Sequence, residues 1–156
     1  MRLLKLLPFI GITTILLGTN IQTVTCDLQE IKDIDVTPTT FTLTINSATD
    51  GVAIVDQEAC TWYYFTNDTS GTVKVAGSLN SNMTANTALK ANFTLAGGGT
   101  SQGSVSFTAA AQNLVTNITS PGANTAGTAF TMTFTATSAA ALGQQVKTVT
   151  FTLADT

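Results

Sequence analysis

The sequence has 156 residues, with six basic and nine acidic side chains, a net charge of −3, two Cys and no His. This length is enough for one domain with a substantial hydrophobic core. The composition excludes His-based catalytic triads, zincin motifs and four-Cys metal sites, and so few basic residues provide no stripe for binding nucleic acid. We therefore expect no metal, no other cofactor and no enzymatic activity.

The N-terminal segment, residues 1–25, is predicted to be a secretory signal peptide. Arg2 and Lys5 form a short basic start, and residues 6–17 are an apolar run that is too short to span a bilayer comfortably. We therefore expect an exported protein, secreted or held at the cell surface, whose mature part has no membrane span.

Two interpretations concern Cys26, which a cut after position 25 would leave at the new N-terminus. An exported chain with two cysteines favours a disulfide between Cys26 and Cys60. Such a bridge would stabilise the fold by about 3–4 kcal/mol through loop closure. The competing interpretation is lipidation of Cys26, which would leave Cys60 as a free thiol.

From Thr37 onward the dominant hydrophobic period is two. Three segments alternate apolar residues with Thr, at residues 41–45, 130–137 and 149–153. Strict alternation is typical of half-buried strands in an antiparallel sheet, and β-branched Thr suits the outer face. We therefore expect seven apolar side chains to face one core: Phe41, Leu43, Phe130, Met132, Phe134, Phe151 and Leu153.

Weaker strand signals fill the interval between these segments. They lie at residues 52–55, 60–66, 72–79, 89–95 and 104–109, separated by turn residues that include Pro121-Gly122 and Gly127. Residues 109–118 are compatible with either a short helical corner or a short strand. The segments together predict an all-β fold, an antiparallel immunoglobulin-like β-sandwich of about eight strands over residues 38–156.

The densest aromatic cluster, residues 62–65, lies within one of these predicted strands. Trp62 and Tyr64 share one face of the strand, and Tyr63 and Phe65 share the other. A buried Trp near a Cys is common on a central sandwich strand, so Trp62 is interpreted mainly as a core residue. The alternative is that Trp62, Tyr63 or Phe65 stacks on the rings of a bound glycan.

Charge is distributed unevenly along the chain. Eight of the nine acids precede residue 69, and only three charged residues, all Lys, lie between residues 69 and 154. Such a neutral surface favours repeated protein contacts, a glycan coat or burial in an assembly. Four glycosylation sequons, at Asn67, Asn82, Asn92 and Asn117, are close to the number expected by chance. The acids match no calcium-loop spacing, so we interpret them as solvated.

The order of these features is informative. An early Thr-alternating strand is followed by an aromatic strand running into Asn67-Asp68 and by a final apolar-alternating strand near the C-terminus. This layout resembles bacterial fimbrial subunits, pilin-like proteins of immunoglobulin-like fold assembled by the chaperone–usher route. The chain departs from the better-known pilins in its cysteine placement and in lacking a Tyr near residue 156. The resemblance implies polymerisation by strand donation, in which one subunit's N-terminal segment fills a groove in the next.

Under this resemblance, the acidic segment 26–37 is the candidate donor. Its apolar residues would contact the groove: Leu28, Ile31, Ile34 and Val36. The alternatives are an ordinary first strand of the same domain or a disordered acidic tail.

We therefore expect a non-catalytic structural or adhesive subunit of an extracellular or cell-surface assembly, such as a fimbria- or pilus-like filament. Its partners would be other copies of itself or surface proteins. The alternative is a secreted monomeric β-sandwich module that binds a glycan or the cell wall.

Overall fold

The computed structural model describes residues 25–46, 54–69, 71–94 and 99–156, so nearly all of the predicted signal peptide lies outside the described residues. The described residues form nine strands and no helix, which confirms the all-β prediction. The strands are β1 (Lys32–Thr37), β2 (Ile54–Thr66), β3 (Thr72–Leu79), β4 (Thr87–Phe93), β5 (Thr100–Ser101), β6 (Ser104–Ser106), β7 (Gln112–Thr119), β8 (Gly122–Ala136) and β9 (Val149–Asp155).

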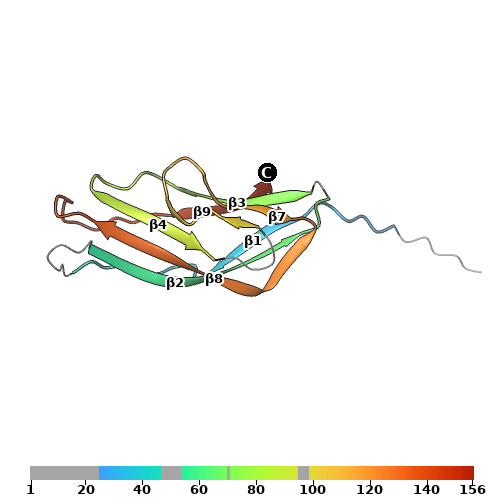
Figure 1. Cartoon of the computed structure of the whole chain (residues 1–156), viewed down its shortest axis with the longest axis horizontal. Coiled ribbons are helices and arrows are strands. Elements are labelled where there is room, and N and C mark those ends of the chain that lie inside the picture. Colours follow the sequence, from blue (N-terminus) through green and yellow to red (C-terminus); the bar gives the residue numbers. More distant parts are fainter. Residues whose placement is uncertain (1–24, 47–53, 70, 95–98) are drawn as a thin grey trace, which may run out of the picture.

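The strands form two antiparallel sheets that pack face to face (Figure 1). The first sheet, sheet A, has the order β1-β2-β8-β4-β6, and the second, sheet B, has the order β5-β7-β3-β9. The series β1-β2-β8-β4 and β3-β9 correspond to strands A-B-E-D and C-F of an immunoglobulin domain. In that fold a strand G lies beside F, but no described strand occupies the equivalent position beside β9.

β8 is the central strand of sheet A, between β2 and β4, and its side chains alternate between the core and the outer face. Phe130 and Met132 are buried, whereas the intervening Thr131 is only partly buried on the outer face. Gly127 was predicted to separate two strands but lies inside β8, at a bulge where the β2–β8 register shifts between Trp62 and Tyr64. The bulge allows β8 to continue as one strand through a local change of direction.

Aromatic rings from both sheets fill the core. Phe93 stacks on Phe130 with a centroid separation of 4.2 Å, and Phe151 of sheet B meets both rings at about 6 Å. Trp62 stacks on Tyr64 and meets the edge of Phe93, each at 5.5 Å. Such ring pairs stabilise a core by about 0.5–1.5 kcal/mol beyond the burial of their area.

One segment differs from the sequence prediction, and for another the structure decides between two alternatives. Residues 38–46 alternate apolar and polar side chains but form no ladder with another described strand. Residues 112–119 form β7, so the strand alternative is correct for this segment and the helical corner is wrong. β1 pairs with β2 from Lys32 to Thr37, so these residues of the acidic segment form an ordinary first strand in this structure.

The Phe93–Phe130 contact provides a direct test of the inward and outward assignments. We expect Phe130→Ala to lower the free energy of unfolding by about 3–5 kcal/mol, because it leaves a cavity beneath a fully buried ring. The matched variant Thr131→Ser, one residue along the same strand, should change it by less than about 0.5 kcal/mol. Urea denaturation followed by circular dichroism measures both, and equal losses would mean that the facing of β8 is wrong.

Candidate functional site

An open groove of about 930 Å³ lies along one side of the sandwich, next to the start of β9. One wall is the segment 38–45, and the other is the segment 143–149. The floor consists of apolar side chains of the core and its margin: Leu89, Phe130, Met132, Phe134 and Phe151. Phe134 and Phe151 pack against the core but are only partly buried, so core surface reaches the solvent here.

The first wall, residues 38–45, begins where β1 leaves sheet A. Pro38 has no N–H and ends the ladder that β1 forms with β2. The wall is held at its far end by the Thr44 N–H, which donates to a carboxylate oxygen of Asp56 at 2.5 Å. Within the described chain no backbone–backbone hydrogen bond joins residues 38–46 to a neighbour, so, apart from the Thr44 N–H, this wall presents main-chain groups without a backbone partner.

The second wall, residues 143–149, is held by the loop that follows β3. The Gln145 side chain accepts from the Thr84 N–H at 3.0 Å, and Lys147 Nζ donates to Ser81 Oγ at 2.9 Å. Asn80 and Thr148 are joined by a backbone hydrogen bond of 3.0 Å. These contacts fix the wall from its outer side and leave its inner side facing the groove.

The free edge of β9 continues the second wall. β9 pairs with β3 from Val149 to Asp155, and its other edge has no strand partner among the described residues. This edge coincides with the place of strand G noted above. The groove therefore combines an unpaired strand edge, a second unpaired extended segment and an exposed strip of core.

The structure divides the predicted donor segment into two parts. Ile34 and Val36 lie in β1 and pack against the core of their own domain. Residues 25–31 instead form a tail, in which Leu28 is 77% exposed, while the main chain of Gln29 and Ile31 is hydrogen-bonded to Asn67 of the same domain. The tail leaves the sandwich at the end opposite to the 137–148 connection that carries the second wall (Figure 1).

Lys32 anchors the base of this tail, a role that the sequence analysis did not assign. Its ammonium lies 2.6 Å from Glu30, 3.2 Å from Asp68 and 2.7 Å from Asp155. Hydrogen bonds to Asp155 and Glu30, opposed by desolvation, raise the pKa of Lys32 above its ordinary value. The three carboxylates therefore surround a permanently charged side chain.

The two cysteines are both free in the structure, so the predicted disulfide is not formed. Cys60 is only 2% exposed, facing the core opposite Phe130, whereas Cys26 is exposed on the tail. The register that joins Lys32 to Thr66 puts the base of the tail six residues from Cys60 along β2, about 20 Å away. Burial, together with the nearby charge of Glu58, raises the pKa of Cys60 to about 11.

The aromatic strand separates its residues as alternation predicts. Trp62 is 1% exposed and belongs to the core, so it has no ring face available for a ligand. Tyr63 and Phe65 lie on the outer face of sheet A, and Phe65 is 45% exposed.

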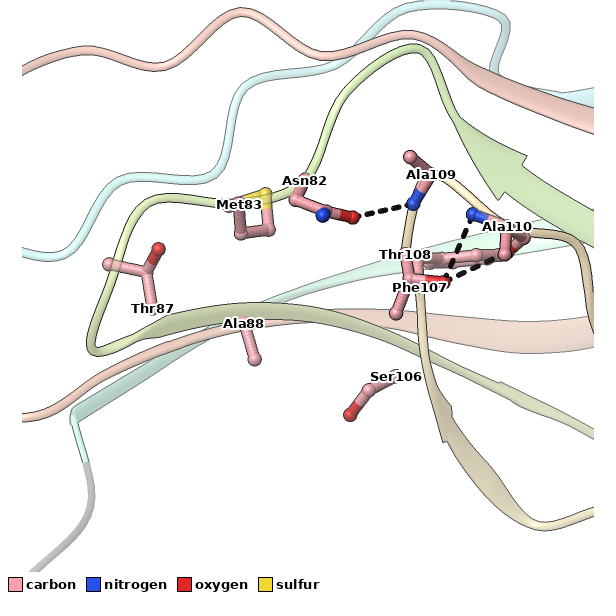
Figure 2. A pocket seen from close by; sticks show the side chains of 9 residues that line it. All are labelled: Asn82, Met83, Thr87, Ala88, Ser106, Phe107, Thr108, Ala109 and Ala110. Carbon is pink, nitrogen blue, oxygen red and sulfur yellow. Dashed lines mark hydrogen bonds between the residues drawn. The ribbon is translucent and has the colours of Figure 1, made fainter.

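A second, smaller hollow of about 570 Å³ lies between the loop after β3 and the segment after β6 (Figure 2). It is lined by polar side chains, by alanines and by the apolar side chains of Met83 and Phe107. The Asn82 side chain accepts from the Ala109 N–H at 2.7 Å, and Thr108 bonds to Ala110 (Figure 2). These groups are used to hold the loops together, and no charged residue lines the hollow.

In the part of the chain that the structure covers, no group of three or more His, Cys, Asp or Glu residues is arranged to hold a metal ion. The same residues include no helix long and apolar enough to cross a membrane.

No protein-family model, curated protein or solved structure matches this chain. The assignment of a function therefore depends on the fold and on the geometry of the groove.

Thiol labelling tests the environments of the two cysteines. We expect iodoacetamide at pH 8 to label Cys26 rapidly in the folded protein and Cys60 only after unfolding, because Cys60 is buried and its pKa is about 11. Mass spectrometry of tryptic peptides measures each site. Protection of both cysteines that is removed only by a reductant would instead demonstrate the disulfide.

A glycine substitution tests the bulge in β8. Gly127 has φ +75°, and a Cβ there would lie 2.6 Å from Tyr63 Cε1 and 2.6 Å from Thr61 Cγ2. We expect Gly127→Ala to destabilise the fold by about 2–5 kcal/mol, from backbone strain plus overpacking. Gly103 is the control, since it has φ +69° but no atom within 4 Å of its would-be Cβ. Thermal melts of the two Ala variants should differ, and similar losses would show that strain alone decides the effect.

Proposed function

We propose that the protein is a non-catalytic structural subunit of an extracellular or cell-surface assembly. In this assembly the tail of one copy, residues 25–31, lies as an added strand in the groove of the next copy. The observation that carries the proposal is the groove itself, where a free strand edge and an unpaired wall border exposed core surface.

The dimensions of the tail and the groove support this pairing. Seven extended residues span about 23 Å at the rise of a β-strand, and the eight residues of the wall 38–45 span about 26 Å. Insertion of the whole tail requires Gln29 and Ile31 to exchange their hydrogen bonds with Asn67 for bonds to the groove. An inserted strand would bond to β9 through its main chain, and its alternate side chains would enter the groove, which is the usual mode of strand addition. Cys26 and Leu28 are two residues apart, so both would point to the same face.

The polarity of the two surfaces also agrees. The tail carries the exposed Asp27, as well as Glu30, which is paired with Lys32, and Lys147 is the one charged residue among those that line the groove. The tail leaves the sandwich at the end opposite to the 137–148 connection, which carries one wall of the groove, so the contact joins different surfaces of two copies (Figure 1). Contacts of this kind repeat head to tail and produce a ring or an open filament.

Site-specific cross-linking tests the proposal. Two variants are mixed, both with Cys26→Ser, one with Leu28→Cys and the other with Val149→Cys in the groove wall. We expect an intermolecular disulfide under mild oxidation, because a seated tail brings Leu28 close to the floor beside β9. The control replaces Val149→Cys by Leu142→Cys, a fully exposed position outside the groove lining.

Light scattering completes the experiment. The wild type should form species larger than a monomer, and Leu28→Asp should shift them towards the monomer while leaving the thermal melt unchanged, because Leu28 touches no core. A monodisperse monomeric wild type at millimolar concentration, or equal cross-linking to positions 142 and 149, would contradict the proposal.

A further inference from the structure

An aromatic and acidic patch lies on the outer face of sheet A, and strand donation does not use it. This outer patch consists of Tyr63 and Phe65 on β2 and of Asp33 and Asp35 on β1. Asp33 is the register partner of Phe65, and Asp35 is the partner of Tyr63. Directly opposed residues in an antiparallel pair share a face, with their Cβ atoms about 4.5–5.5 Å apart.

The ring of Tyr63 is held in place by the bulge in β8. A Cβ at Gly127 would lie 2.6 Å from Tyr63 Cε1 and 2.8 Å from Cζ, so the ring covers this glycine closely. A ring that lies against backbone on one side presents its other side outwards. Together with Phe65, two residues along the same strand, Tyr63 forms an apolar platform whose orientation is set before any ligand binds.

The two carboxylates beside the platform are not neutralised by the protein. Asp33 and Asp35 are exposed, and neither forms an ion pair with a described residue. Asp35 Oδ1 accepts from the Val36 N–H at 2.8 Å, which leaves its second oxygen available. Lys32, next in sequence to Asp33, lies on the opposite face of β1 with its three carboxylate partners.

We propose that the outer patch binds a polysaccharide built of amino sugars with free, positively charged amino groups. The apolar face of a pyranose ring stacks on the platform, and the ammonium group lies beside Asp33 and Asp35. A neutral glycan would provide no positive charge for Asp33 and Asp35. A small cation would provide the charge but no apolar ring face to stack on Tyr63 and Phe65. The patch is separate from the groove, so this binding does not depend on the proposed assembly.

Titration calorimetry with a glucosamine hexamer tests the proposal, with the N-acetylglucosamine hexamer, a neutral glucose hexamer and a lysine hexamer as comparison ligands. We expect the glucosamine hexamer to bind most tightly and 0.5 M salt to weaken it. Phe65→Ala should weaken binding about three- to fivefold through the loss of one ring-stacking contact. Asp33→Asn combined with Asp35→Asn should have at least the same effect.

Matched controls separate the patch from general surface effects. Val55→Ala removes another exposed apolar side chain from the outer face of β2, and Asp27→Asn removes an acid of the tail. Neither control should change glucosamine affinity. Three results would each overturn the proposal: no binding at millimolar ligand, equal binding of the lysine hexamer, or binding that Phe65→Ala and the double Asn variant leave unchanged.

Discussion

The structure depends on one unfulfilled pairing, at the free edge of β9. Sheet B ends there, and the segment that would face it across the gap, residues 38–45, is extended but makes no backbone ladder with another described segment. Partly buried Phe134 and Phe151 lie between them, at the margin of an otherwise closed aromatic core. The main-chain groups of the β9 edge and of residues 38–45 thus face the same space as a strip of apolar surface. An inserted β-strand could form hydrogen bonds with the main-chain groups and cover the apolar strip with its side chains.

The polar composition of the surface is consistent with this arrangement. Exposed edges in monomeric proteins are usually protected by Lys, Pro or inward-pointing charges. Here Asp56 and Glu58 point inwards on β2, since they pair with Phe134 and Met132 of the core face. These charges protect residues 54–60 of β2, which have no pairing with β1, against the addition of another strand. The edge of β9 instead carries Thr residues and no Lys from Val149 to Asp155, and its one charged residue, Asp155, is paired with Lys32.

Most of the fold could be predicted from the sequence, because alternation with Thr reports directly on a two-faced strand. The buried residues of β8 and β9 follow this period, as do the opposite directions of Trp62 and Tyr63. Alternation does not reveal whether a strand finds a partner, which explains why residues 41–45 match the pattern without forming a ladder. The predicted burial of Phe41 is also wrong, because its segment has no strand partner: Phe41 was expected in the core but is 39% exposed.

The candidate site was less accessible to sequence reasoning. The apolar residues of segment 26–37 were recognised, but the division at Lys32 depends on tertiary pairing with β2. The wall 143–149 has little apolar periodicity and is positioned by contacts with residues more than sixty positions away, such as Gln145 with Thr84. Gly127 was predicted to be a turn residue, because the sequence does not distinguish a turn glycine from a glycine with positive φ in a β-bulge.

Lys32 connects parts of the molecule that the chain itself keeps apart. It joins Glu30 at the base of the tail to Asp68 after β2 and to Asp155 at the end of β9, and β9 is the strand that borders the groove. Tension applied to the tail would therefore pass directly into both sheets rather than peel β1 away from β2 one hydrogen bond at a time. A mechanical load entering along the tail would then be shared between the two layers of the sandwich.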